Sequence, residues 1–218
     1  RNMLQDRFGR AVEYVRLSVT DRCDLRCSYC IPKGFKDFAE PDDWLTFAEI
    51  ERVIGAFVRL GARRVRLTGG EPLLRRGVVD LAARLAGPLK AAGVGRVNVS
   101  LDSLRRECMA EVTGCDSLPQ VLDGLKAAKA AGLTPIKLNM VLLPGVNDQD
   151  VESMVAFCIE HGFILRLIEA MPMGDSGRSV GYLDAQGVLA RLRARFDLRP
   201  QTVSLGGGPA RYWATADG

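Results

Sequence analysis

The stretch that decides the fold runs from Val15 to Cys30 and reads VRLSVTDRCDLRCSYC. Its first six residues, VRLSVT, are rich in β-branched and apolar side chains, which predicts a short buried strand. Three cysteines follow at once, Cys23, Cys27 and Cys30, in a loop with the spacing CxxxCxxC. The sequence therefore predicts a strand that leads directly into a loop able to carry chemistry.

Outward from this stretch, strands alternate with helices. Further strands are predicted at VRLT (65–68), RVNVSL (96–101), PIKLNMVLL (135–143) and ILRLIEA (164–170). Helices are predicted at 46–61, where Thr46 and Glu49 form a capping box, and at 78–86, 118–132, 150–161 and within 183–196. Hydrophobic strands that are each followed by a helix favour a parallel sheet covered by helices. Five such units fit either a doubly wound sheet or most of a barrel, and spacing alone does not choose between them.

The composition is that of a globular protein. The chain has 218 residues, 47% hydrophobic and 26% charged, which suits one domain; we assign residues 1–200 to it and 201–218 to the start of a C-terminal extension. No apolar run approaches the roughly 20 residues of a membrane span, and the first ten residues do not resemble a secretory signal, so we expect a cytoplasmic protein. The net charge is +4, and the arginines are dispersed along the chain. This distribution favours an ordinary solvated surface over a nucleic-acid binding site.

The cysteine loop predicts a metal site. Three thiolates in one short loop suit a soft metal, whereas a structural zinc site needs a fourth ligand that no neighbouring Cys or His supplies. A 4Fe–4S cluster held by three cysteines instead leaves one iron open for a substrate or cofactor. Zinc binding or plain packing is the alternative. Cys108, Cys115 and Cys158 lie in or beside helices at unsuitable spacing, and we expect them to pack.

This loop, with Tyr29 before its last cysteine, resembles that of the radical S-adenosylmethionine superfamily. The resemblance implies a partial parallel β/α barrel of the TIM type. Five of its strands are predicted here, and a sixth is missing from the numbered chain. It also implies a cluster whose open iron holds S-adenosylmethionine, the source of a 5′-deoxyadenosyl radical. Gly69-Gly70-Glu71-Pro72, a turn when taken alone, resembles the segment that holds the methionyl amino group in that superfamily.

Six motifs in order narrow the resemblance to the family of GTP 3′,8-cyclases, which begin molybdenum-cofactor biosynthesis. They are LSVTDRCDLRCSYCIP, RLTGGEPLLR, VNVSLDSL, KLNMVLLPGVND, RLIEAMPMGD and GPARYW. Carried over by motif, the metal ligands are Cys23, Cys27 and Cys30; the S-adenosylmethionine contacts are Tyr29, Gly69, Gly70, Glu71, Ser100 and Met171; and the GTP contacts are Arg16, Arg66 and Lys137. For the three basic residues, the alternative is a surface or interstrand ion pair.

The implied reaction is removal of a hydrogen from the ribose C3′ of GTP and closure of a ring onto C8 of guanine. The product is (8S)-3′,8-cyclo-7,8-dihydroguanosine 5′-triphosphate. The resemblance implies an electron donor such as flavodoxin or ferredoxin and transfer of the product to cyclic pyranopterin monophosphate synthase. It implies neither a nucleic-acid partner nor a membrane, and it leaves a homodimer open. Two other readings are a radical S-adenosylmethionine paralogue acting on another substrate, such as a peptide, and a non-catalytic remnant.

The sequence departs from the family at two places. The family has a second 4Fe–4S cluster in a C-terminal region that would follow Gly218, and we expect that cluster only if the region exists. About one βα unit between the strands at 65–68 and 96–101 is also absent, at a join near Gly87. Either a paralogue has lost the unit, or residues are omitted from the numbered chain. We favour omission, because loss of a central strand would expose unpaired backbone.

Overall fold

The computed structural model covers residues 1–218 and describes residues 4–32, 34–38, 44–76, 81, 97–130, 132, 134–202 and 210–216. It divides into two compact units, which we describe separately. Unit 1 comprises Arg1–Cys27, Ile31–Arg96 and Thr113–Cys115, and unit 2 comprises Ser28–Cys30, Val97–Val112 and Asp116–Gly218. The cysteine loop therefore contributes residues to both units.

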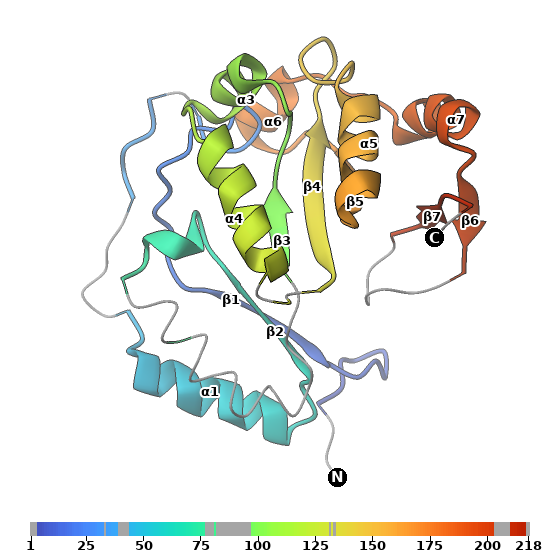
Figure 1. Cartoon of the computed structure of the whole chain (residues 1–218). Coiled ribbons are helices and arrows are strands. Elements are labelled where there is room, and N and C mark those ends of the chain that lie inside the picture. The colour runs from blue at the N-terminus through green and yellow to red at the C-terminus, as the bar shows by residue number, and fades with distance from the viewer. Residues whose placement is uncertain are drawn as a thin grey trace. The chain divides into compact units, whose positions relative to one another are not determined.

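The described residues of unit 1 include two parallel strands and the helix α1 (Figure 1). Its elements are β1 (Tyr14–Ser18), α1 (Phe47–Arg59), β2 (Arg64–Thr68) and the short 3₁₀ helix η1 (Pro72–Leu74). The predicted capping box is confirmed, because Thr46 accepts from the Glu49 amide and the Glu49 side chain accepts from the Thr46 amide. The predicted strands and this helix are therefore confirmed.

The two faces of the unit-1 sheet differ. One face carries Val15, Leu17, Val65 and Leu67, which pack with Val19, Leu81 and two buried residues of α1, Ile50 and Ile54. Alternate residues of a strand point to opposite faces, so Arg16 and Arg66 lie on the other face. The apolar side chains of α1 thus cover one face of the sheet, and the opposite face is polar.

Unit 2 contains a parallel three-stranded sheet in the order β3-β4-β5, with a separate antiparallel pair, β6-β7. Its elements are β3 (Val97–Ser100), α3 (Arg106–Thr113), α4 (Leu118–Ala130), β4 (Ile136–Leu142), α5 (Val151–His161), β5 (Ile164–Glu169), α6 (Gly174–Ser179), α7 (Ala185–Phe196), β6 (Arg199–Gln201) and β7 (Tyr212–Ala214). Figure 1 shows α4 and α5 lying against this sheet.

The core of unit 2 lies between β4 and its covering helices. Leu138, Met140 and Leu142 of β4 are fully buried and pack with α4, α5 and α7. Cys158 of α5 belongs to this core, and Cys108 of α3 is buried in a neighbouring apolar cluster. Burial raises the pKa of Cys158 to about 12, which keeps its thiol protonated. The prediction that these two cysteines pack is confirmed.

The strands at 96–101, 135–143 and 164–170 and the helices at 118–132, 150–161 and 183–196 are confirmed within one to three residues at their ends. No bounds were predicted for α3, although Cys108 was expected in or beside a helix, and neither α6 nor the β6-β7 pair was predicted. α6 has the sequence GDSGRS, which has no apolar period, and β6 and β7 have three residues each. The helix predicted at 78–86 lies outside the described residues except for Leu81.

The alternating pattern correctly predicted the parallel α/β class. The predicted boundary between 1–200 and 201–218 stays a prediction. Among the described helices, the structure contains none with the length and apolar character needed to cross a membrane.

Candidate functional site

The cysteine loop follows β1 directly. Cys23 and Cys27 are half-buried in unit 1, Cys30 is exposed in unit 2, and none of the three forms a disulfide. Cys23 also lines a pocket of about 350 Å³ in unit 1, together with Arg22, Asp24, Arg26, Phe38 and Leu74. The thiol of Cys23 therefore lies beside space that a ligand could fill.

The donor set of this loop fits an iron–sulfur cluster. Three thiols within eight residues, outside any disulfide and open to solvent in part, are the soft ligands that such clusters need. Among the residues that the structure describes, no three Cys, His, Asp or Glu side chains already converge as a metal site. The fit consequently rests on the chemistry of the donors.

The glycine turn after β2 is tied to the beginning of the cysteine loop. The Gly70 amide donates to the Thr20 carbonyl at 3.0 Å, and the Glu71 amide donates to the Arg22 carbonyl at 2.8 Å. A Cβ atom at Gly69 would collide with the Thr20 carbonyl oxygen, and one at Gly70 would collide with that of Arg22. Sequence reasoning explained the glycines by the approach of a ligand, and the structure adds a second reason, the approach of the loop's own backbone.

Two arginines lie next to each other on the polar face of unit 1. Arg16 of β1 and Arg66 of β2 are register partners, so their side chains leave the same face of the sheet. Arg66 lies over the Tyr14 ring, with 5.8 Å from its Cζ to the ring centroid. Neither arginine forms an ion pair with a described residue, so the interstrand ion pair that was the alternative is not observed among these residues. Adjacent like charges destabilise a sheet unless an anion lies between them.

The sheet of unit 2 also has a polar face. Asn98 of β3 pairs in register with Lys137 of β4, and Ser100 pairs with Asn139, which in turn pairs with Arg166 of β5. These five residues share one face because they occupy alternate positions of parallel strands. Parallel sheets ordinarily bury apolar side chains on both faces, so a polar face marks a place for a ligand.

Two groups on this face are buried. Asn139 Oδ1 is buried and has no hydrogen-bond partner among the described residues. Lys137 is 4% exposed, and its Nζ lies 3.3 Å from the Tyr212 hydroxyl of β7. A buried amide oxygen without a partner costs about 1–3 kcal/mol, which a bound donor would recover.

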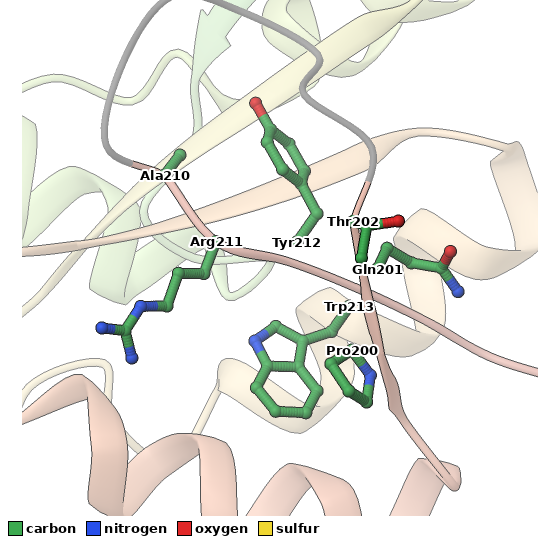
Figure 2. Close-up of a pocket in the computed structure, with 7 residues that line it drawn as sticks. All are labelled: Pro200, Gln201, Thr202, Ala210, Arg211, Tyr212 and Trp213. Atoms are coloured by element: carbon green, nitrogen blue, oxygen red, sulfur yellow. The ribbon is translucent and has the colours of Figure 1, made fainter.

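The pocket on the β6-β7 pair lies behind the same tyrosine. It has a volume of about 290 Å³ and is lined by Pro200, Gln201, Thr202, Ala210, Arg211, Tyr212 and Trp213 (Figure 2). The Tyr212 hydroxyl of this pocket contacts Lys137, a predicted site residue. The pocket is therefore peripheral to the polar face of unit 2.

The structure distributes the predicted site residues over the two units. Unit 1 holds Arg16, Cys23, Cys27, Arg66, Gly69, Gly70 and Glu71, and unit 2 holds Tyr29, Cys30, Ser100, Lys137 and Met171. Met171 is 67% exposed directly after β5, and Ser100 is exposed at the end of β3. Sequence reasoning missed Asn98, Asn139 and Arg166. Their signal was a polar residue at every second position of an otherwise apolar strand.

Comparison with known families identifies the class of protein. The sequence model of the radical SAM superfamily matches residues 17–88 and 84–158, which together make up most of the chain. The chain therefore belongs to the radical SAM superfamily, and the predicted cofactors, a 4Fe–4S cluster and S-adenosylmethionine, are confirmed as those of its family.

Curated relatives place the chain more closely, within the family of GTP 3′,8-cyclases. It is 42% identical to the GTP 3′,8-cyclase of Ectopseudomonas mendocina, covering 97% of this chain and 71% of the relative. It is likewise 42% identical to GTP 3′,8-cyclase 2 of Pseudomonas aeruginosa, with 98% and 71% covered. For GTP 3′,8-cyclase 2 of Mycobacterium tuberculosis the identity is 44%, with 96% and 65% covered.

Solved structures confirm the fold. SuiB of Streptococcus suis bound to S-adenosylmethionine superposes with a TM-score of 0.64 at 18% identity, covering 84% of this chain and 46% of SuiB. The maturase HydG superposes with a TM-score of 0.56 at 13% identity, covering 83% of this chain and 48% of HydG. At these identities the likeness concerns the fold alone, which is the predicted partial β/α barrel of the radical SAM type.

The comparisons also bear on the missing βα unit. The alignment with the E. mendocina relative runs over 236 positions but includes 97% of the 218 residues here, about 211 residues. About 25 positions of the relative therefore have no counterpart, and the alignment with the Streptomyces coelicolor relative, 243 positions over the whole chain, gives the same shortfall. The two matches to the superfamily model meet at residues 84–88, where the sequence predicts the join. The shortfall agrees with the predicted absence of about one βα unit, and omission of these residues from the numbered chain stays a prediction.

Proposed function

We propose that this chain is a radical S-adenosylmethionine enzyme that cyclises GTP at C3′ and C8, as the names of its relatives indicate for them. The observation that carries this proposal is the pair of arginines on the polar face of unit 1. Arg16 and Arg66 lie in register without an ion-pair partner among the described residues, beside a strand that leads into the cysteine loop. Two guanidinium groups on one face suit the charge and geometry of a triphosphate.

Cys23, Cys27 and Cys30 would hold the cluster through their thiolates. Gly69, Gly70 and Glu71, with Tyr29, Ser100 and Met171, would hold S-adenosylmethionine. The link between the glycine turn and the backbone of Thr20 and Arg22 supports this assignment, since it fixes the turn beside the start of the cysteine loop. When bound, the cluster and S-adenosylmethionine supply the radical that removes a hydrogen atom from the substrate.

The chain's own task is to place GTP. Arg16 and Arg66 would bind phosphate oxygens through charge-assisted hydrogen bonds. Lys137 is assigned to GTP by its motif. Asn139 and Arg166 share that face and add a buried acceptor and a further cation. Held in one position, the ribose C3′ can meet the radical without diffusing, and exclusion of water limits side reactions.

The remaining expectations follow from this function and are part of the proposal. They comprise a flavodoxin- or ferredoxin-type electron donor, release of the product to a cyclic pyranopterin monophosphate synthase and a place in the cytoplasm. A homodimer stays open, and a second cluster would require the C-terminal region. The peptide-modifying reading has no support beyond the fold likeness to SuiB, whose crystallised complex includes a precursor peptide.

The shortfall of about 25 positions favours one competing function, a remnant that binds nucleotide without cleaving S-adenosylmethionine. Among the described residues, β2 pairs only with β1, and β3 pairs only with β4. An absent barrel strand would account for both open edges. A remnant of this kind predicts GTP binding with neither iron uptake nor deoxyadenosine formation.

Iron loading tests the cluster assignment. The chain is reconstituted with iron and sulfide under anaerobic conditions, and iron is counted beside the spectrum of the reduced cluster. We expect about four iron atoms per chain at the first site. Cys27→Ser should lose them and all deoxyadenosine formation, while the matched control Cys115→Ser should retain both. Iron uptake that survives Cys27→Ser would contradict the assignment.

A further inference from the structure

Asp102 is a buried acid that the proposed site does not use. It stands two residues after Ser100, just beyond the end of β3, and it is 1% exposed. Burial raises its pKa, and hydrogen bonds from the Val141 amide and the Tyr29 hydroxyl oppose that rise. A buried carboxylate is retained only where its hydrogen bonds offset the loss of hydration, so its partners indicate its use.

Both carboxylate oxygens of Asp102 have a partner. Oδ1 accepts from the Val141 amide of β4 at 2.8 Å, and Oδ2 accepts from the Tyr29 hydroxyl at 2.8 Å. The first bond anchors the acid to the sheet, and the second reaches the cysteine loop, where Tyr29 stands between Cys27 and Cys30. Asp102 thus connects the rigid β3-β4 pair to the middle of that loop.

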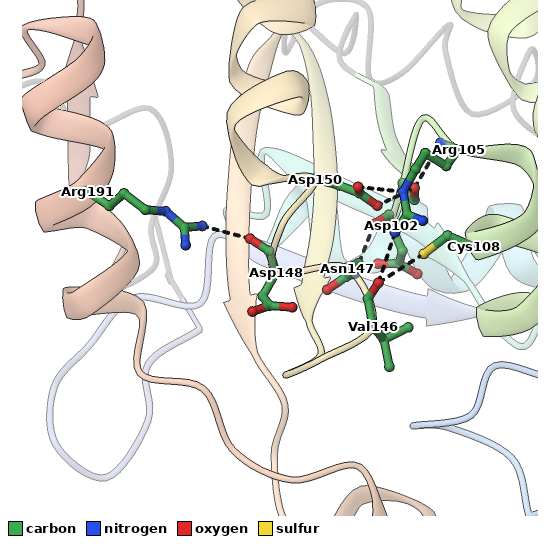
Figure 3. A network of polar contacts seen from close by, with 9 residues as sticks. Asp102, Arg105, Cys108, Val146, Asn147, Asp148, Asp150 and Arg191 are labelled. Atoms are coloured by element: carbon green, nitrogen blue, oxygen red, sulfur yellow. Dashed lines mark hydrogen bonds and ion pairs between the residues drawn. The ribbon is translucent and has the colours of Figure 1, made fainter.

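The backbone of Asp102 is fixed as well. The buried amide of Asn147 donates to the Asp102 carbonyl at 2.9 Å and to the Val141 carbonyl at 2.8 Å. Asn147 Oδ1 in turn accepts from the Leu143 amide at 2.9 Å. Figure 3 shows Asp102 and Asn147 close together. Because Asn147 holds both Asp102 and Val141, the carboxylate cannot drift relative to β4.

A second acid completes the network without touching the loop. Asp150 accepts from the Ser103 hydroxyl and from Arg105 Nε, both at 2.7 Å. Its bonds brace the residues that follow Asp102 against the beginning of α5 (Figure 3). Asp150 therefore offers a matched control, since it is a neighbouring acid of the same network with no bond to Tyr29.

The loop residues around Tyr29 are held at one more point. The Ser28 amide donates to the Val112 carbonyl of α3 at 3.0 Å, and the Tyr29 ring packs with Cys108, Val112, Leu143 and Ala170. These contacts make Ser28–Cys30 part of unit 2. The hydroxyl bond to Asp102 adds a charged contact, and it holds the outer end of the ring in place.

We propose that Asp102 is a positioning residue that acts through Tyr29 to hold Cys30 where the cluster forms. This inference rests on the proposed function, in which Cys30 is a cluster ligand. Loss of either end of the Asp102–Tyr29 bond frees the loop between Cys27 and Cys30. The cluster is then bound less tightly, although every ligand is still present.

Three variants test the link: Asp102→Asn, Tyr29→Phe and the two combined. An asparagine at 102 can still accept from the Val141 amide through its one oxygen, but its amide nitrogen can only donate to the Tyr29 oxygen, so the charge-assisted bond from the Tyr29 hydroxyl is lost. The first readout is amide hydrogen exchange at Ser28 in the cluster-free chain. We expect each single change to speed that exchange about tenfold and the double variant to add little, because both remove the same interaction. Asp150→Asn should change it less than twofold.

The second readout is the reconstituted cluster, followed by iron release to a chelator and by the electron paramagnetic resonance spectrum of its reduced form. Release should be about tenfold faster in Asp102→Asn and Tyr29→Phe, with an altered spectrum, and unchanged in Asp150→Asn. Equal changes in Asp150→Asn, additive effects of the two single changes or an undisturbed Asp102→Asn would each overturn the inference. Failure of the wild-type chain to take up iron would instead contradict the proposed function, and the exchange data would still decide the link.

Discussion

The two parallel sheets of this molecule follow one plan at different scales. In unit 1, the two described strands pack against α1 through a small apolar core. In unit 2, three strands pack against α4, α5 and α7 through a much larger core. Each sheet keeps its opposite face polar, but Arg16 in unit 1 is exposed whereas Lys137 in unit 2 is 4% exposed.

The two polar faces contribute differently to binding and to stability. Arg16 on the polar face of unit 1 is exposed, so its side chain contributes little to packing. Unit 2 has a core large enough to carry buried polar groups such as Asn139. Substitutions on the polar face of unit 1 should therefore affect binding alone, and those in unit 2 should affect binding and folding together.

The largest effect is expected from Arg16→Ala. Loss of a charge-assisted bond of about 1.5–3 kcal/mol should lower kcat/KM for GTP roughly 10- to 100-fold. Uncoupled cleavage of S-adenosylmethionine and the thermal midpoint should change little, because the side chain is exposed. Steady-state kinetics check the first expectation. Arg64→Ala is the control, since Arg64 lies on the neighbouring strand but faces Glu13 at 4.0 Å. A parallel loss of GTP use and uncoupled cleavage would assign Arg16 elsewhere.

Lys137→Met should reduce GTP use by about tenfold and should also alter the unfolding midpoint. The Lys137 side chain is buried and contacts Tyr212, so its replacement changes packing as well as charge. Denaturant unfolding beside kinetics separates the two effects. If Lys137→Met lowered GTP use without changing the unfolding midpoint, as expected of Arg16→Ala, the two units would not differ in the way described.

Asn139→Leu should leave the ligand-free chain as stable as the wild type or more stable, by up to about 1 kcal/mol. The change removes an amide oxygen that has no partner among the described residues. Stabilisation by added ligand, measured as the shift in midpoint, should shrink at the same time. Destabilisation of the ligand-free chain would show that Asn139 serves the fold and not a ligand.

Asp150→Asn should have the smallest effect, a modest loss of stability at neutral pH that fades in acid. Burial raises the pKa of Asp150, but hydrogen bonds from Arg105 and Ser103 outweigh it, so the folded pKa lies below the ordinary value of 3.8. A lowered pKa gives stability that is present above that value and is lost as pH falls through the folded pKa. Below about pH 4, the unfolding free energy of the variant should therefore fall less steeply with decreasing pH than that of the wild type. An unchanged acid limb would argue against the ion pair with Arg105.

The sequence allowed prediction of what depends on local pattern. The capping box at Thr46, the five parallel strands and the cysteine loop each have a signal within a few residues. The signal for the polar faces was weaker, because a lysine or an arginine within a strand does not reveal which residues pair with it on the neighbouring strand. The bond between Tyr29 and Asp102 joins residues 73 positions apart and had no signal at all. Site residues that act through tertiary contacts therefore had to come from the structure.

In the proposed function, this chain couples S-adenosylmethionine cleavage to the cyclisation of GTP. The direct measurement is formation of 5′-deoxyadenosine by the reduced, reconstituted chain under anaerobic conditions, with and without GTP, by mass spectrometry. We predict formation that rises when GTP is added and is accompanied by a cyclised nucleotide. Formation that is indifferent to GTP, or absent in a chain that carries its cluster, would contradict the claim.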